Sequence, residues 1–198
     1  MDRNAAYELM CQYTESESLR RHMICVEIAM RAYAKRFASE LGLTADDIEK
    51  WAIVGLLHDF DYEQNPNPPD HPLVGSKILA EQGYPADVIY AIKSHVDQVN
   101  DVEPCPRVSP MDKTLFAVDE LCGFITAVAL MRPNRLGGMK SKSVRKKMKQ
   151  KSFAEKVSRD DIVNGAEDLG IELNEHIQFV IDALAQHAVE LELAGSSD

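Results

Sequence analysis

The chain has 198 residues, of which 45% are hydrophobic and 27% are charged. This length is enough to bury a core within one domain, and this composition excludes a mainly disordered chain. No run reaches the about 18 apolar residues of a membrane span, and the net charge of −10 argues against nonspecific binding to nucleic acid. The first residues lack the basic and then apolar order of a secretory signal, so we expect a cytoplasmic protein without membrane contact.

Helix start and stop signals recur along the whole chain, and no alternating strand pattern or internal repeat interrupts them. Apolar residues recur every three or four positions from Ser16 to Gly42, which is typical of one long helix with a buried face. Thr44–Asp47 has the form of a capping box and precedes a strongly apolar helix that should end near His58. These patterns predict an all-α protein.

Proline, glycine and capping residues mark the later boundaries. The proline-rich stretches 65–70 and 99–110 are predicted as loops. The later helices are expected to begin at Pro72, Pro85, Pro110, Ser158 and Asn174. The four cysteines include no Cys-x-x-Cys pair, so we expect free thiols at Cys11, Cys25, Cys105 and Cys122.

Four histidines lie in the first half of the chain, three of them in or beside apolar helical segments: His22, His58, His71 and His95. One such histidine alone is most simply a core residue with a hydrogen-bond partner. However, His58-Asp59 ends the apolar run 52–57, and burying both groups is costly unless a cation satisfies them. Asp119 lies in a similarly apolar helical stretch. The set therefore indicates a metal site.

The order of these residues resembles the HD superfamily of metal-dependent phosphohydrolases, in particular small bacterial proteins of the HDIG type. The resemblance rests on the segments Gly55-Leu-Leu-His-Asp59 and His71-Pro-Leu-Val-Gly-Ser76, together with His22, His95 and Asp119. It spans about residues 18–125 and implies a helical bundle of the HD-domain type.

The resemblance implies that His22, His58, Asp59 and Asp119 ligate one divalent metal ion. His71 and His95 would hold a second, with Asp59 as the bridging ligand. Because no cysteine belongs to the set, the residue types favour Mn, Fe, Ni, Co or Mg. The implied enzyme is a phosphomonoesterase or phosphodiesterase in which one or two metals activate water against a nucleotide or similar small phosphorylated metabolite.

The chain departs from the family pattern at two positions. His95-Val96-Asp97 stands where many relatives have two adjacent histidines and a glutamate, and Phe60-Asp61 replaces the commoner Ile-Gly after His58-Asp59. We predict Asp59 and Asp97 as catalytic residues, with Asp97 acting as a base from outside the metal ligands. No Gly-Tyr-Pro element follows His95, which argues against the cyclic-dinucleotide phosphodiesterase branch.

The second half contains a basic segment, with ten Lys and Arg against two acidic residues between Arg135 and Asp160. Its simplest interpretation is a solvated helix face. The sharper hypothesis is that Lys142, Arg145 and Lys149, which share one helical face, bind the substrate phosphate, with the preceding glycines 137–138 as a hinge.

We expect residues 1–198 to form a single HD domain, with a metal-binding core over about 18–125 and a C-terminal helical extension that contains the basic segment 135–160. Two alternatives to a hydrolase stay open: an HD-fold di-iron oxygenase and a non-catalytic nucleotide-binding regulatory module. A nucleic-acid partner is not expected, and the sequence leaves the oligomeric state open.

Overall fold

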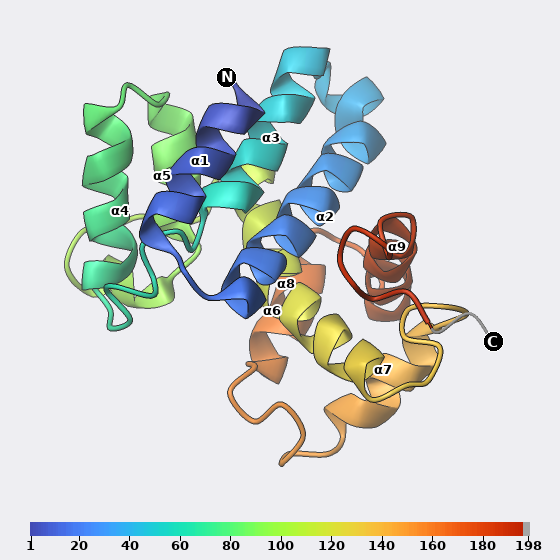
Figure 1. The fold of residues 1–198 in the computed structure, drawn as a ribbon. Helices are drawn as coiled ribbons and strands as arrows, with labels where there is room; N and C mark the ends of the chain where they lie inside the picture. The colour runs from blue at the N-terminus through green and yellow to red at the C-terminus, as the bar shows by residue number, and fades with distance from the viewer. Residues whose placement is uncertain (196–198) are drawn as a thin grey trace. The chain divides into compact units, whose positions relative to one another are not determined.

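The computed structural model describes residues 1–195, and over this part of the chain it contains nine α-helices, one 3-10 helix and no β-strand (Figure 1). The helices are α1 (Arg3–Tyr13), α2 (Glu17–Leu41), α3 (Ala45–Leu57), α4 (Asp70–Glu81), α5 (Ala86–Ser94), η1 (Asp97–Asp101), α6 (Pro110–Leu130), α7 (Ser141–Met148), α8 (Arg159–Asp168) and α9 (Leu173–Ala185). The predicted all-α fold is confirmed. None of the helices in the described residues combines the length and hydropathy of a transmembrane span.

The chain divides into two compact units, unit 1 over Met1–Phe116 and unit 2 from Ala117 onward. The boundary falls within α6, so the first two turns of this helix belong to unit 1. All four histidines of the predicted metal site lie in unit 1, whereas the basic segment lies in unit 2. The expectation of a single HD domain over residues 1–198 stays a prediction.

Unit 1 is built around α2 and α3, which pack along each other, while α1 and α5 also pack on α3. The two backbones approach closely at Gly55: a Cβ atom there would lie 2.8 Å from backbone atoms of Val26 and Glu27. A residue with a side chain cannot occupy this position unless the helices move apart. Gly55 therefore sets the spacing between the helices that carry His22 and His58.

Capping residues fix the ends of α2 and α3 where the sequence predicts them. The Ser16 hydroxyl accepts a hydrogen bond from the Leu19 N–H group, and Gly42, with a φ of 66°, ends α2 in the left-handed conformation. The Thr44 hydroxyl accepts the Asp47 N–H group at 3.2 Å, and the Asp47 carboxylate accepts the Thr44 N–H group at 3.0 Å. The predicted capping box is confirmed.

Replacing Thr44 with alanine is expected to lower the free energy of unfolding by about 1 kcal/mol, because the Asp47 N–H group loses its side-chain acceptor. Urea unfolding followed by circular dichroism measures this change. Thr44→Ser keeps the hydroxyl and should retain most of the stability, so equal losses in both variants would contradict the capping explanation.

Helix α1 was not predicted from the sequence. Only Ala6, Leu9 and Met10 of this helix are buried, which leaves a weak apolar pattern. Its attachment is partly ionic: the guanidinium of Arg3 donates two hydrogen bonds, of 2.5 and 2.7 Å, to the carboxylate of Glu27 on α2, which is 3% exposed. A pairing between residues so far apart in sequence cannot be read from local periodicity.

The start of α4 is irregular. His71 has an extended backbone, with φ −81° and ψ 129°, so the regular helix begins at Pro72 as predicted. The helix then runs to Glu81 and packs on α5. The irregular start places the His71 side chain at the N-terminal end of α4 instead of on its flank.

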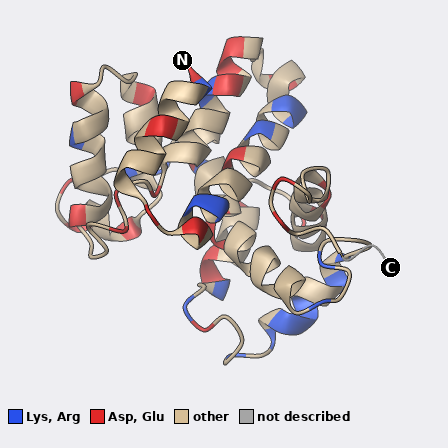
Figure 2. Ribbon diagram, viewed as in Figure 1, with Lys and Arg blue, Asp and Glu red and all other residues tan. Residues whose placement is uncertain are grey.

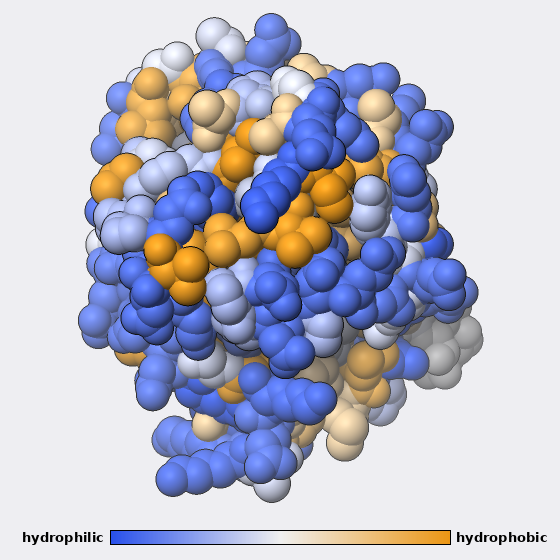
Figure 3. Space-filling view, turned by 90° about the vertical axis from the view of Figure 1, so that its left-hand side faces the viewer, coloured by the Kyte–Doolittle hydropathy of each residue, from blue (hydrophilic) through white to orange (hydrophobic). Residues whose placement is uncertain are grey.

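Figure 3 shows the side of the molecule on which α4 and α5 lie in Figure 1. Hydrophilic residues cover most of this face, and a patch of hydrophobic residues lies among them. Exposed large hydrophobic side chains of unit 1 include Tyr62, Val102 and Val108. Some exposed apolar surface is common in globular proteins, so this face does not by itself define a binding site.

Unit 2 packs α7 and α8 on α9. A Cβ atom on Gly165 of α8 would lie 2.5 Å from the Cα atom of Ala117, and His176 on α9 bonds through Nε2 to the Ala117 carbonyl at 2.9 Å. His176 is therefore a buried structural histidine. Lys and Arg residues gather along α7 (Figure 2), as the local composition predicts.

Candidate metal centre

The ends of helices position the candidate ligands of unit 1. His22 lies within α2, whereas His58 directly follows α3 and His95 directly follows α5. Adjacent residues on a helix point about 100° apart, so His58 and Asp59 can face one site only where the helix ends. The turns that follow Leu57 provide this ending.

The four imidazoles converge on the carboxylate of Asp59. Its Oδ2 atom lies 3.3 Å from Nε2 of His58 and 3.6 Å from Nε2 of His22. Its Oδ1 atom lies 3.2 Å from Nε2 of His71 and 3.6 Å from Nε2 of His95. Each oxygen of this carboxylate therefore faces a different pair of histidines.

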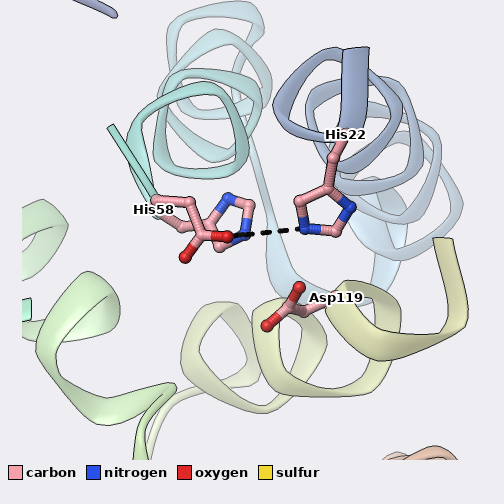
Figure 4. Close-up of side chains that lie close together, drawn as sticks. His22, His58 and Asp119 are labelled. Atoms are coloured by element: carbon pink, nitrogen blue, oxygen red, sulfur yellow. Dashed lines mark ion pairs between the residues drawn. The ribbon is translucent and has the colours of Figure 1, made fainter. Parts of the chain in front are cut away.

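Two overlapping groups of side chains could each hold a metal ion, and within each group the candidate ligand atoms lie within 4.8 Å of one another. The first group is His22, His58, Asp59 and Asp119, and the second is Asp59, His71 and His95. Figure 4 shows His22, His58 and Asp119 of the first group. Asp119 lies on α6, three residues beyond the last residue of unit 1. Both groups coincide with the ligand sets that the family resemblance implies.

Three of the imidazole rings are held in orientation by hydrogen bonds at Nδ1, the ring nitrogen that faces away from Asp59. Nδ1 of His58 lies 2.8 Å from the Gly55 carbonyl, and Nδ1 of His95 lies 2.5 Å from the Ile92 carbonyl. Because a carbonyl only accepts, both Nδ1 atoms carry the hydrogen. Nδ1 of His71 lies 2.8 Å from Oδ1 of Asp61. These bonds leave the Nε2 atoms, which carry lone pairs in the neutral rings, directed at Asp59.

This arrangement fits a metal ion. The Nε2 atoms of His71 and His95 are 3.3 Å apart, and both lie near a carboxylate oxygen, so acceptor atoms face acceptor atoms. Such crowding is unfavourable unless a cation or a proton lies between the lone pairs. Imidazole and carboxylate ligands, with no cysteine in either group, suit divalent transition metals. The clustered side chains could therefore hold a divalent ion.

The electrostatics of the cluster favour an ionised Asp59. Burial alone would raise the pKa of its carboxyl group, but the charge of His58 and hydrogen bonds from His58, His71 and His95 hold that pKa well below its usual range. Burial lowers the pKa of His71, but hydrogen bonds to Asp59 and Asp61 outweigh it and raise that pKa to about 9. A proton and a divalent ion thus compete for the same imidazole.

The cluster is partly open to solvent. The side chains of His22 and Asp59 are 20% and 15% exposed, whereas His58 is fully buried. A ligand could therefore approach on the side of His22 and Asp59.

The structure places the remaining predicted residues outside both groups. Asp97 begins η1, and its carboxylate accepts a hydrogen bond of 2.5 Å from Arg107. Lys142 and Arg145 lie on α7, and Lys149 directly follows it. Their predicted roles, Asp97 as a base and the three cations as phosphate ligands, stay predictions.

Sequence reasoning missed the role of Asp61, which it treated only as a departure from the family pattern. The residue is 1% exposed and accepts the bond from His71. The available signal was a second carboxylate two positions after Asp59, directly after the apolar residue Phe60, which is fully buried.

One of the comparisons with known proteins finds a match. The family model of the HD domain matches residues 20–122, a range that includes every residue of the two groups. The chain therefore belongs to the HD-domain family. No curated protein and no solved structure matches it. The narrower resemblance to the HDIG type stays a prediction.

Proposed function

We propose that this chain is a metal-dependent phosphohydrolase whose centre holds two divalent ions. The observation that carries the proposal is the position of Asp59, whose two carboxylate oxygens face two different pairs of imidazoles at 3.2–3.6 Å. One ion would be held by His22, His58, Asp59 and Asp119. The second would be held by His71 and His95, with Asp59 shared between the ions.

The membership in the HD-domain family supports hydrolysis, since the family consists mostly of phosphohydrolases. Divalent ions bound here would lower the pKa of a coordinated water molecule and polarise a phosphoryl oxygen. Two such ions with Asp59 and Asp119 give a local charge of about +2, which attracts a phosphate group. We propose a nucleotide or similar small phosphorylated metabolite as the substrate.

The residues of this chain then have distinct tasks. His58 and His95 present Nε2 toward the centre because backbone carbonyls hold their Nδ1 hydrogens. Asp97 would act as a base only after its ion pair with Arg107 opens. Lys142, Arg145 and Lys149 would bind the substrate phosphate through their shared face of the α7 segment.

Phosphate release from a panel of nucleotides and sugar phosphates tests the proposal, with the wild-type protein loaded in turn with Mn, Fe, Ni, Co and Mg. We expect metal-dependent hydrolysis of at least one substrate, and no hydrolysis by Asp59→Ala. Hydrolysis should proceed equally without oxygen. Turnover that requires O₂ would favour the di-iron oxygenase, and stabilisation by nucleotides without any product would favour the regulatory module.

A further inference from the structure

Asp61 is a buried carboxylate that touches the second group of ligands without belonging to it. Its Oδ1 atom accepts a hydrogen bond from Nδ1 of His71 at 2.8 Å, and its Oδ2 atom accepts one from the Gly75 N–H group at 2.7 Å. Both oxygens are thereby engaged, and the residue is 1% exposed. Asp61 therefore connects the turn after α3 to the start of α4.

The carboxylate of Asp61 packs closely against the backbone of Gly75 on α4. A Cβ atom on Gly75 would lie 2.7–2.9 Å from Cγ and both carboxylate oxygens of Asp61. The absence of a side chain at Gly75 is what lets the carboxylate reach the backbone N–H group. The position of the Asp61 carboxylate, and with it the His71 ring, is thus defined on two sides.

His71 needs such a partner because of its place in the fold. His58 and His95 follow their helices, where carbonyl groups of the last turn are available three residues earlier. His71 lies at the N-terminal end of α4 with an extended backbone, and helix carbonyls point away from that end. Its Nδ1 hydrogen is therefore held by a side chain, which can be substituted, instead of by the backbone.

We propose that Asp61 is the positioning residue that determines whether the second metal ion binds, by keeping the hydrogen of His71 on Nδ1 and its Nε2 lone pair toward Asp59. This inference rests on the two-ion centre proposed above. A carboxylate behind a ligating imidazole fixes its tautomer and raises its basicity, and loss of such a partner weakens metal binding about 10- to 100-fold.

Asp61→Asn reverses the hydrogen-bond pattern. The single amide oxygen is needed by the buried Gly75 N–H group, so the NH₂ group faces Nδ1 of His71 and donates to it. The neutral ring then carries its hydrogen on Nε2, where it cannot ligate a metal. We expect this variant to bind the first ion with unchanged affinity and the second about 10- to 100-fold more weakly.

The experiment is a calorimetric titration of metal-free protein with Mn²⁺, with electron paramagnetic resonance spectra at each stoichiometry. Wild-type protein should bind two ions per chain and give an exchange-coupled spectrum. Asp61→Asn should give the spectrum of an isolated ion at the same Mn²⁺ concentration. Gly75→Ala, which displaces the carboxylate without removing it, should show the same selective loss.

Asp112→Asn is the matched control. Asp112 is also buried, at 2% exposure, and its Oδ2 atom accepts the N–H groups of Val108 and Ser109, but neither group of candidate ligands includes it. This variant should bind both ions as the wild type does. If Asp61→Asn binds both ions normally, or loses both to the same degree, the assignment of Asp61 is wrong. Wild-type protein that binds fewer than two ions would instead overturn the two-ion centre together with this role.

Discussion

Replacing Asp59 with asparagine is expected to reduce the metal content of the purified protein from about two ions per chain to nearly none. Asp59 belongs to both groups of candidate ligands, and its two oxygens face all four histidines. An amide offers only one oxygen and no negative charge. The affinity for each ion should therefore fall by more than the about 10- to 100-fold that loss of a supporting residue costs.

Elemental analysis measures this metal content, as moles of each metal per chain, in protein purified without chelator. Asp101→Asn is the control, because Asp101 is an exposed carboxylate of unit 1 that belongs to neither group. If iron is the main metal, the next assays should test for oxygenation as well as hydrolysis. An unchanged metal content in Asp59→Asn, or no metal in either protein after reconstitution, would contradict the proposed centre.

Replacing Gly55 with alanine is expected to have the largest effect on stability. The added Cβ atom would lie 2.8 Å from backbone atoms of α2, so the two helices must separate. Such overpacking costs about 1–3 kcal/mol, against a gain of about 0.5–1 kcal/mol from the helix preference of alanine. Because the Gly55 carbonyl also holds Nδ1 of His58, we expect weaker binding of the first ion as well.

Urea unfolding of the metal-free protein and a Mn²⁺ titration test both effects. Thr44→Ala serves as the control, because it weakens the opposite end of α3 without altering the contact between α2 and α3. Gly55→Ala should lose both stability and metal affinity, whereas Thr44→Ala should lose stability alone. Unchanged metal binding in Gly55→Ala would show that the helix spacing does not set the position of His58.

The sequence predicted those features that depend on local chemistry. Three such features are confirmed: the capping box at Thr44, the end of α2 at Gly42 and the start of regular helix at Pro72. They could be predicted because each depends on residues within one turn. The two ligand groups could be anticipated only through the family resemblance. Their members come from three helices, α2, α4 and α6, and from the turns that follow α3 and α5, and spacing along the chain does not bring them together.

The features that were missed depend on partners distant in sequence. Helix α1 is attached through Arg3 to a carboxylate 24 residues away, and Asp61 is explained only by a histidine and a glycine that follow it by 10 and 14 residues. Asp97 pairs with Arg107 in the same way. Such long-range pairs are set by tertiary packing, about which local patterns carry no information.

The hydrogen bonds of His58 and His95 link the length of two helices to the chemistry of the centre. In both cases Nδ1 bonds to the carbonyl three residues earlier, in the last turn of the helix that the histidine follows. Carbonyls at helix C-termini require partners from outside the helix, and a ligating imidazole requires an acceptor for its second nitrogen. One contact satisfies both requirements. Lengthening or shortening α3 or α5 by a single residue would rotate the ring about 100° away from Asp59, so insertions and deletions at these two helix ends should be tolerated less well than in the surrounding loops.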